Sequence, residues 1–336
     1  MMQRKIDEYV ELLADNMALM GNYAHFVNSS KKMLLVEGTT DEKFVRKMIN
    51  DDVWCITAVD AFSNEDFLMT PGKRQSQNNK LAIIGVTYGL SKYPTLINSK
   101  GLEKWNVYGM IDRDFDEPTN HTDTPKLFIT DTHDLETLLL STDDSLMDRI
   151  DRCTIADEDI QKSYFIAYQL GIIRVLIHDV CSEVSLKLLS AGEKEIDYSE
   201  FIANDFRLNI SKLMSFLYNG NKSFYSVQKW KKMVENVLHA KTVKKKFDAT
   251  GSWKQSIEDF DLEKIPDFWN MVNGHDILAL LRYLNDDAKR VYSNSRGRSL
   301  NREFEMDLIE SYDYNNVRST NLYSKMRKEN VVKDIS

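Results

Sequence analysis

The chain has 336 residues, of which 42% are hydrophobic and 29% charged, and its formal net charge is −8. This composition is typical of a globular protein of about two domains and excludes a disordered or collagen-like chain. The three cysteines are scattered and form no CxxC pair, so neither a disulfide framework nor a cysteine-only zinc site is expected. No apolar run approaches the roughly 18 residues that cross a bilayer, and the N-terminal sequence lacks the unbroken apolar stretch of a signal peptide. We therefore expect a cytoplasmic protein with no membrane segment.

The first half of the chain alternates predicted strands with predicted helices. Residues 1–30 have the spacing of an amphipathic helix followed by a loop. Short apolar runs predict strands at residues 33–36, 53–59, 106–111 and 127–130. Helices are predicted at residues 41–50, 80–91 and 135–140, although the apolar run in 80–91 also fits a strand. Such alternation predicts an α/β fold with a parallel sheet and with polar groups gathered where the strands end.

The pattern changes after about residue 150. Residues 160–189 and 208–217 have helical periodicity, and strand signals become sparse. The predicted organisation is an N-terminal helix (1–30), a parallel-sheet domain (31–150) and a mostly helical region for substrate, partner or dimer contacts (151–336).

Four carboxylates occupy the ends of predicted strands. Glu37 ends the first strand and Asp41 follows four residues later, while Asp112 and Asp114 come directly after the third strand. Alternate residues of an extended stretch point to one side, so this Asp-x-Asp pair can converge on one ion, and Glu37 faces it if the strands are neighbours. Clustered carboxylates repel one another, and Mg²⁺ or Mn²⁺ would relieve that repulsion. The alternative is structural, because Asp41 can cap a helix and Asp-x-Asp is common in solvated turns.

Two short segments resemble the TOPRIM domain of topoisomerases, bacterial primases and OLD-family nucleases. Residues 36–41 read VEGTTD, and residues 111–114 read IDRD. Residues 131–136 (DTHDLE) and 273–276 (NGHD) also resemble the TOPRIM effectors encoded beside an ABC-type ATPase in PARIS anti-phage systems. The resemblance implies a TOPRIM (Rossmann-like) domain over about residues 30–140.

The resemblance also implies a metal-dependent nuclease using Mg²⁺ or Mn²⁺. Glu37 matches the essential acid, and Asp41, Asp112 and Asp114 match the other metal-binding positions, with Glu37, Asp112 and Asp114 as the catalytic group. Asp116 is a weaker match.

Further polar residues are candidates for a supporting layer around the metal. Glu136 and His133 lie near the end of the fourth predicted strand, and His275 lies in the NGHD segment. Each histidine also has a purely structural interpretation. OLD-type nucleases use a lysine near the scissile phosphate, and the choice among Lys73, Lys80 and the later lysines stays open.

A local basic segment lies at residues 222–254, with nine lysines, two acidic residues and several interleaved aromatic residues. Lysines bind phosphates and aromatic rings stack on unpaired bases, although a solvated helix face has the same composition. The candidate nucleic-acid-binding residues are Lys229, Lys231, Lys232, Lys244, Lys245 and Lys246.

The leading hypothesis is a TOPRIM nuclease that is the toxic effector of a two-component anti-phage system. The resemblance implies RNA, with tRNA favoured, as the substrate, an ABC-type ATPase partner that restrains the enzyme, and a homodimer when active. The sequence has no GxSxG, HExxH or P-loop motif, so a partner must perform any controlling nucleotide hydrolysis. The alternatives are an OLD-type DNA nickase or endonuclease, and a non-catalytic TOPRIM-like subunit that binds nucleic acid or the ATPase.

Overall fold

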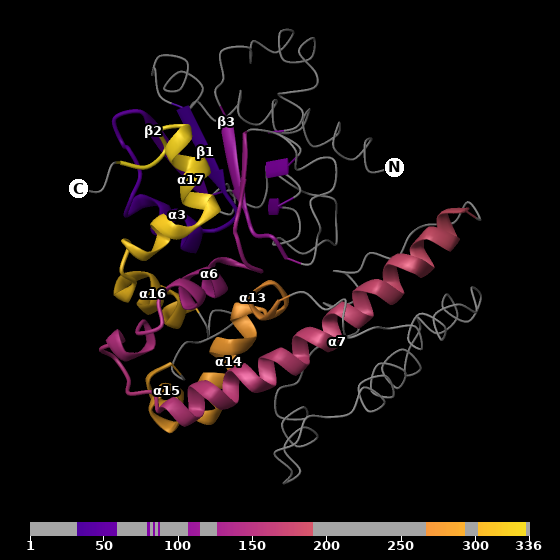
Figure 1. Ribbon diagram of the computed structural model, residues 1–336. Coiled ribbons are helices and arrows are strands. Elements are labelled where there is room, and N and C mark those ends of the chain that lie inside the picture. The colour runs from indigo at the N-terminus through magenta and orange to yellow at the C-terminus, as the bar shows by residue number, and fades with distance from the viewer. Residues whose placement is uncertain are drawn as a thin grey trace, which may run out of the picture. The chain divides into compact units, whose positions relative to one another are not determined.

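The structure is a computed structural model, and Figure 1 shows the arrangement of its helices and strands. It describes residues 32–58, 79–80, 83–84, 87, 107–114, 126–190, 267–292 and 302–333. The chain divides into two compact units, one formed by Met1–Thr154 and Asn294–Ser336 and the other by Ile155–Ser293. The predicted N-terminal helix and the basic segment lie outside the described residues.

A four-stranded parallel sheet forms the core of the first unit. Its strands are β1 (Lys32–Val36), β2 (Trp54–Ala58), β3 (Val107–Ile111) and β4 (Leu127–Ile129). The order across the sheet is β2-β1-β3-β4, and every pairing is parallel. The prediction of an α/β fold with a parallel sheet is therefore confirmed, and all four predicted strands are present.

The strand order places a topological switch point between β1 and β3. From β1 the chain adds β2 on one side, and it later adds β3 and β4 on the other side. Val36 pairs with Ala58 of β2 and with Met110 of β3, so the residues after β1 and β3 emerge next to each other. Open α/β sheets bind ligands at this crevice outside the carboxyl ends of the strands.

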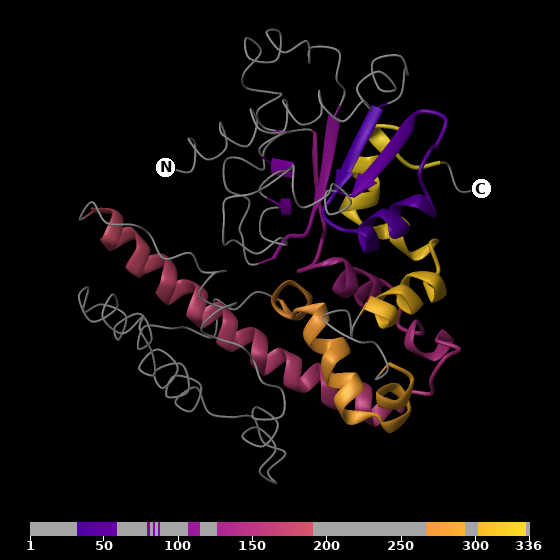
Figure 2. The same ribbon diagram turned by 180° about the vertical axis from the view of Figure 1, so that it is seen from behind.

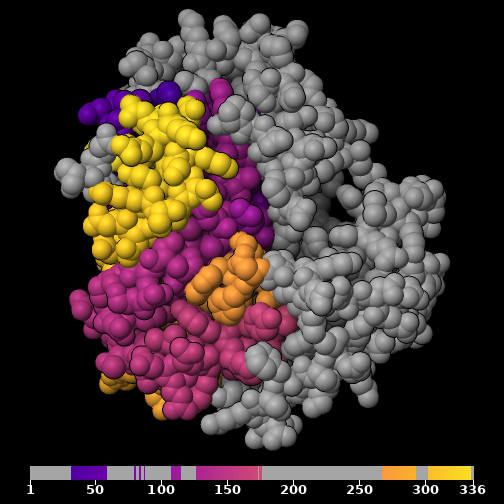
Figure 3. All heavy atoms as spheres, viewed as in Figure 1, coloured from indigo at the N-terminus to yellow at the C-terminus, as the bar shows by residue number. Residues whose placement is uncertain are grey.

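Helices from both ends of the unit cover the sheet. They are α3 (Thr39–Arg46), α6 (Leu135–Thr142), α16 (Arg302–Ser311) and α17 (Asn321–Lys328), with 3₁₀ turns at Met147–Arg149 and Asn316–Ser319. The two views of the ribbon show α3 and α17 on the same face of the sheet (Figures 1 and 2). In the space-filling view the C-terminal residues form a continuous yellow surface over this unit (Figure 3).

The two faces of β3 show why a glycine occupies its centre. Tyr108 points toward the end of α17, where its hydroxyl donates to Glu329 Oε2 at 2.8 Å. The next residue, Gly109, faces the helical residues near Ile83, and a Cβ there would lie 2.3 Å from Ile83 Cγ2. The described residues of the predicted 80–91 segment are helical, so its strand alternative is not observed among them.

The second unit is helical in its described part. It contains α7 (Asp157–Ser190), α13 (Phe268–Met271), α14 (Gly274–Leu284) and α15 (Asp286–Val291). Gly171 lets α7 approach α13, since a Cβ at that position would lie 2.8 Å from the backbone oxygen of Met271. The prediction of helical structure after the sheet is confirmed for these residues. Among the helices that the structure describes, none has both the length and the apolar character needed to span a membrane.

Candidate metal centre

Glu37 lies at the switch point and is held from two sides. Its Oε1 accepts a hydrogen bond from the backbone N–H of Asp112, across the β1–β3 boundary, at 3.0 Å. Its backbone carbonyl accepts a hydrogen bond from Nδ2 of Asn79, a buried residue of the helical segment behind the sheet, at 2.9 Å. These contacts bring together the two predicted strand ends, which are 75 residues apart in the sequence.

Asp41 is both a helix-capping residue and a member of the acidic cluster. Its Oδ2 accepts a hydrogen bond at 2.8 Å from the N–H of Gly38, the N-cap residue immediately before α3. This confirms the capping role that the sequence left open. The Asp41 charge also raises the pKa values of Glu37 and Asp112, so the two interpretations are compatible.

The two aspartates after β3 have different environments. Asp112 Oδ1 is buried and has no hydrogen-bond partner among the described residues. Asp114 is more exposed, and its backbone adopts a left-handed conformation with φ 50°, which aspartate tolerates better than most residues. The Asp114 N–H donates to the His133 carbonyl at 2.7 Å, which holds this turn. The expectation of a fully extended Asp-x-Asp segment is therefore corrected, because the backbone turns at its second aspartate.

Burial and mutual repulsion keep protons on this cluster. Burial raises the pKa of Glu37 from 4.5 to about 8, and the negative charge of Asp114 adds to the increase. Burial is also the largest cause of the raised pKa of Asp112, followed by the charges of Asp41 and Glu37. Without a cation, the Glu37 carboxyl is mostly protonated at neutral pH. A metal ion would compete with these protons for the same oxygens.

The structure identifies which lysine accompanies the carboxylates. Lys80 Nζ lies 2.7 Å from Asp114 Oδ2, and only 12% of its side chain is exposed. It also lies 3.4 Å from the backbone carbonyl oxygen of Arg113, and its charge lowers the pKa of Glu37. The sequence could not choose Lys80 among many lysines, because its proximity arises from a helical segment 34 residues away from Asp114.

A fifth carboxylate, Asp134, was not among the predicted site residues. Its negative charge raises the pKa of Asp112. Asp134 begins α6, where its Oδ1 accepts the N–H of Thr137 at 2.9 Å, and its Oδ2 lies 3.2 Å from Nδ1 of His133. The sequence places Asp134 after a predicted strand, at a position typical of a helix cap. That position does not show that its charge acts on Asp112.

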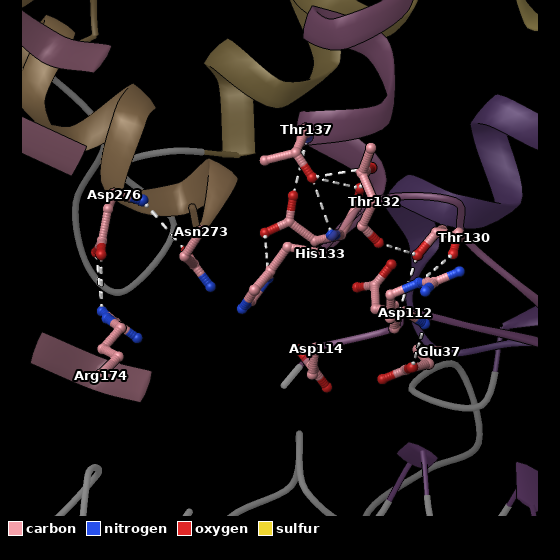
Figure 4. Close-up of polar contacts among 12 residues, drawn as sticks. Glu37, Asp112, Asp114, Thr130, Thr132, His133, Thr137, Arg174, Asn273 and Asp276 are labelled. Atoms are coloured by element: carbon pink, nitrogen blue, oxygen red, sulfur yellow. Dashed lines mark hydrogen bonds and ion pairs between the residues drawn. The ribbon is translucent and has the colours of Figure 1, made fainter. Parts of the chain in front are cut away.

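Buried threonines connect the ends of β3 and β4. Thr130 Oγ1 accepts the N–H of Arg113 at 2.9 Å and donates to the carbonyl of Thr132 at 2.9 Å. Thr137 Oγ1 lies 3.1 Å from Thr132 Oγ1 and continues the network into α6 (Figure 4). His133, which is 2% exposed, is therefore held between this network and Asp114.

Two other acidic residues near β4 have separate surroundings. Asp131 accepts the N–H groups of Asn321 and Leu322 at 3.0 and 2.8 Å, so it caps α17. Glu136 is buried in the first turn of α6, where its carboxylate comes within 4.8 Å of that of Glu305 on α16. The structure therefore places Glu136 in a second acidic pair.

The predicted residue His275 belongs to the second unit. It is exposed in the first turn of α14, whose start is capped by Asn273 Oδ1 accepting the Asp276 N–H at 3.2 Å. Asp276 also forms an ion pair with Arg174 of α7 at 2.9 Å (Figure 4). Within its unit, the NGHD segment begins a helix and anchors it to α7. Asp116 and the six candidate lysines of the basic segment lie outside the described residues.

The donor set at the switch point fits a divalent cation. Glu37, Asp41, Asp112 and Asp114 offer only hard carboxylate oxygens, and one buried oxygen of Asp112 lacks a hydrogen-bond donor among the described residues. Their repulsion, seen in the raised pKa values of Glu37 and Asp112, is what a bound cation would relieve. Oxygen ligands of this kind suit Mg²⁺ and Mn²⁺.

No family model matches the chain, and no curated protein matches it significantly.

Proposed function

We propose that this protein is a metal-dependent phosphodiesterase that cleaves nucleic acid. The observation that carries this proposal is the acidic cluster at the β1–β3 switch point, where the partly buried Glu37 and Asp112 repel each other and Lys80 forms an ion pair with Asp114. A purely structural cluster would be expected to neutralise its charges with more cations or fewer acids. This imbalance supports an ion-binding role.

The residues have distinct roles in this proposal. Glu37, Asp41, Asp112 and Asp114 would hold Mg²⁺ or Mn²⁺, which when bound supplies an activated water and stabilises charge on a phosphate. The Asp112 N–H orients one oxygen of Glu37, and the Gly38 N–H orients one oxygen of Asp41.

Lys80 is the candidate for direct charge stabilisation. Its ammonium group is 2.7 Å from Asp114 and is largely shielded from solvent, which strengthens its interaction with an incoming phosphate. His133 is a positioning residue, because its carbonyl holds the left-handed turn at Asp114.

The resemblance to TOPRIM effectors supplies the biological part of the proposal. We propose an RNA substrate, with tRNA favoured, and a cytoplasmic effector that an ABC-type ATPase restrains until infection. Active enzyme would be a homodimer. The absence of a P-loop in the sequence supports control by a separate nucleotide-hydrolysing partner.

A cleavage assay on the purified chain tests the proposal. Total RNA, purified tRNA, plasmid and single-stranded DNA are incubated with Mg²⁺, Mn²⁺ or EDTA, and the products are resolved on denaturing gels. Glu37→Gln should abolish metal-dependent cleavage. Glu42→Gln is the matched control, because Glu42 lies on α3 and pairs with Arg46 at 2.8 Å.

Each outcome separates the alternatives. Cleavage of RNA alone supports the effector proposal, whereas nicking of plasmid supports an OLD-type DNA nuclease with the same site. Nucleic-acid binding without cleavage in any metal would support the non-catalytic alternative. Equal cleavage by wild-type and Glu37→Gln protein would refute the proposed site.

The partner is tested by co-expression with an ABC-type ATPase, the class of partner that the resemblance implies. We expect the two proteins to co-elute in size-exclusion chromatography, with cleavage suppressed in the complex relative to the free chain. A partner that suppresses activity must bind the inactive state more tightly than the active state. Equal activity in both fractions would contradict restraint by the partner.

A further inference from the structure

Arg113 lies between the two metal-site aspartates but turns its side chain toward a different strand. Its Nε donates to the backbone carbonyl of Thr130, at the end of β4, at 3.2 Å. Its own N–H donates to the Thr130 hydroxyl at 2.9 Å. The backbone contact holds the main chain at Arg113, and the Nε contact directs the side chain before any ligand arrives.

The terminal nitrogens of this guanidinium have no protein partner in the described part of the chain. Arg113 forms no ion pair with any described carboxylate, although it stands next to Asp112 and Asp114. The cation that pairs with the cluster is instead Lys80. A guanidinium group that is already oriented, and whose two terminal nitrogens can both donate, is suited to bidentate binding of a phosphate.

A second arginine lies beside the start of α3. Arg302, the first residue of α16, is exposed and donates through Nη2 to the hydroxyl of Thr39. Thr39 is the first residue of α3, two positions after Glu37. Like Arg113, Arg302 has no carboxylate partner among the described residues.

Both arginines are therefore anchored at the carboxyl edge of the sheet, which also holds the acidic cluster. Arg113 is anchored at the end of β4, and Arg302 is anchored at the start of α3, beyond the end of β1. In the strand order, β3, which leads into Asp112 and Asp114, lies between β1 and β4. Neighbouring strands are about 4.8 Å apart, so this arrangement spans more than one phosphate of a polynucleotide.

We infer that Arg113 and Arg302 bind the phosphates on either side of the one that is cleaved, so that a single polynucleotide strand crosses the sheet edge from α3 toward β4. This inference rests on the proposed function, because it takes the acidic cluster as the position of the scissile phosphate. It identifies the substrate as a chain of at least three phosphates rather than a mononucleotide.

The first experiment measures binding without cleavage. A fluorescein-labelled 20-nucleotide single-stranded RNA is titrated with the full chain in EDTA at several salt concentrations. Arg113→Gln and Arg302→Gln should each weaken binding about tenfold and lower the log–log salt slope by about 0.7, as expected for one lost phosphate contact. Arg327→Gln is the matched control, since Arg327 is an exposed arginine in the last turn of α17.

The second experiment separates binding from chemistry. With Mg²⁺ present, each variant should raise KM about tenfold and leave kcat within about threefold, because contacts to flanking phosphates act equally in the ground and transition states. Arg113→Lys, which keeps the charge without the fork, should fall between Arg113→Gln and wild type. Thermal unfolding checks that each variant is folded, and exposed Arg302 provides a variant with little structural risk.

The outcomes distinguish this inference from the nuclease proposal. Unchanged salt slopes and KM values in an active enzyme would overturn the inference and leave the nuclease proposal intact. A fall in kcat at constant KM would also overturn it, by placing the arginine at the scissile phosphate. If the variants of a protein that cleaves no nucleic acid have reduced salt slopes, the two arginines bind phosphates as inferred, but the nuclease proposal is contradicted.

Discussion

Charged side chains are arranged differently at the two ends of the strands. The carboxyl edge is the side of the sheet where the parallel strands end, and the amino edge is the side where they begin. At the carboxyl edge, the acidic residues Glu37 and Asp112 are desolvated, repel each other and have raised pKa values. At the amino edge, charged residues are matched with partners. Both edges belong to the same unit and are built by the same strands, so the difference comes from the side chains and not from the backbone.

The amino edge is a stack of aromatic rings and paired charges. Lys32 Nζ lies 5.1 Å from the ring centroid of Trp54 and 5.3 Å from that of Tyr108, and it forms an ion pair with Glu329 at 3.7 Å. Lys126 lies over the same tyrosine ring at 5.6 Å. Burial and the hydrogen bond to Glu329 raise the pKa of Tyr108 to about 12, so it remains a neutral donor.

This contrast indicates that the amino edge stabilises the fold, whereas the carboxyl edge is suited to binding a ligand. Cation–π contacts and a hydrogen bond compensate the charges at the amino edge, which attaches the end of α17 to the sheet. At the carboxyl edge, burial and mutual repulsion of the carboxylates raise the pKa values of Glu37 and Asp112, and this costs stability. Functional sites commonly carry such a cost, because their charges are arranged for a ligand.

The largest effect should come from removing one carboxylate at the carboxyl edge. Asp112→Asn keeps the side-chain shape but replaces a buried carboxylate of the proposed metal site, so the proposed cleavage should fall by about 1,000-fold or more. Tyr108→Phe, at the opposite edge, should leave the single-turnover rate within about threefold. A single-turnover rate for Asp112→Asn close to that of wild type would contradict the functional assignment of the carboxyl edge.

Truncation at the amino edge should affect stability and spare the metal site. Trp54 is 1% exposed, and Trp54→Ala should reduce the free energy of unfolding by about 3 kcal/mol through loss of buried surface and creation of a cavity. Mn²⁺ affinity, measured by calorimetry on the folded variant, should stay within about twofold of wild type. A large loss of affinity in a fully folded variant would show that the two edges are coupled.

The metal-free protein should become less stable as the pH rises through the neutral range. The pKa of Glu37 is about 8 in the folded state and 4.5 in the reference state, so between these values the folded protein holds a proton that the unfolded chain has lost. Its contribution therefore falls by on the order of 5 kcal/mol from pH 4.5 to about pH 8 and levels off above that. Thermal unfolding in EDTA between pH 5 and 8.5 measures this slope.

The same titration series contains its own controls. In Glu37→Gln protein, stability should depend less on pH, because the titrating carboxyl of residue 37 is gone. Saturating Mn²⁺ should stabilise wild-type protein most at high pH, where the carboxylates are ionised. An identical slope in wild-type and Glu37→Gln protein would contradict the raised pKa.

Asp134 should have a moderate effect through its charge. Asp134→Asn retains an oxygen that can cap α6 but removes a negative charge acting on Asp112, so Mn²⁺ affinity should fall about tenfold. Asp131→Asn is the matched control, because that carboxylate caps α17. Isothermal titration of both variants makes the comparison, and equal losses would mean that net charge alone sets affinity.

The smallest effect should follow from a single charge at the amino edge. Glu329→Gln weakens the partly exposed ion pair with Lys32 and the hydrogen bond from Tyr108, and should reduce the free energy of unfolding by at most about 1 kcal/mol. The pKa of Tyr108 should also fall, because its carboxylate partner is removed. Urea unfolding and ultraviolet titration test the two statements, and a loss of several kcal/mol would show a larger anchoring role for α17.

Local patterns in the sequence were sufficient to predict the strands. The apolar runs that predict strands at 33–36 and 106–111 correspond to β1 and β3, because a buried strand needs consecutive apolar residues. The same reasoning placed Glu37 and Asp112 at strand ends. It could not show that β1 and β3 are neighbours, since strand order depends on long-range packing.

The parallel α/β class and the four candidate ligands could be predicted before the fold was known, because local hydrophobic patterns and strand-end positions carry that information. The folded chain was needed to show that Lys80 is the lysine beside Asp114 and that Asp134 adds to the charge at Asp112. It also decided that the left-handed turn at Asp114 is held by His133. These relations join segments distant in sequence or depend on the burial of charge, and both arise only when the chain has folded.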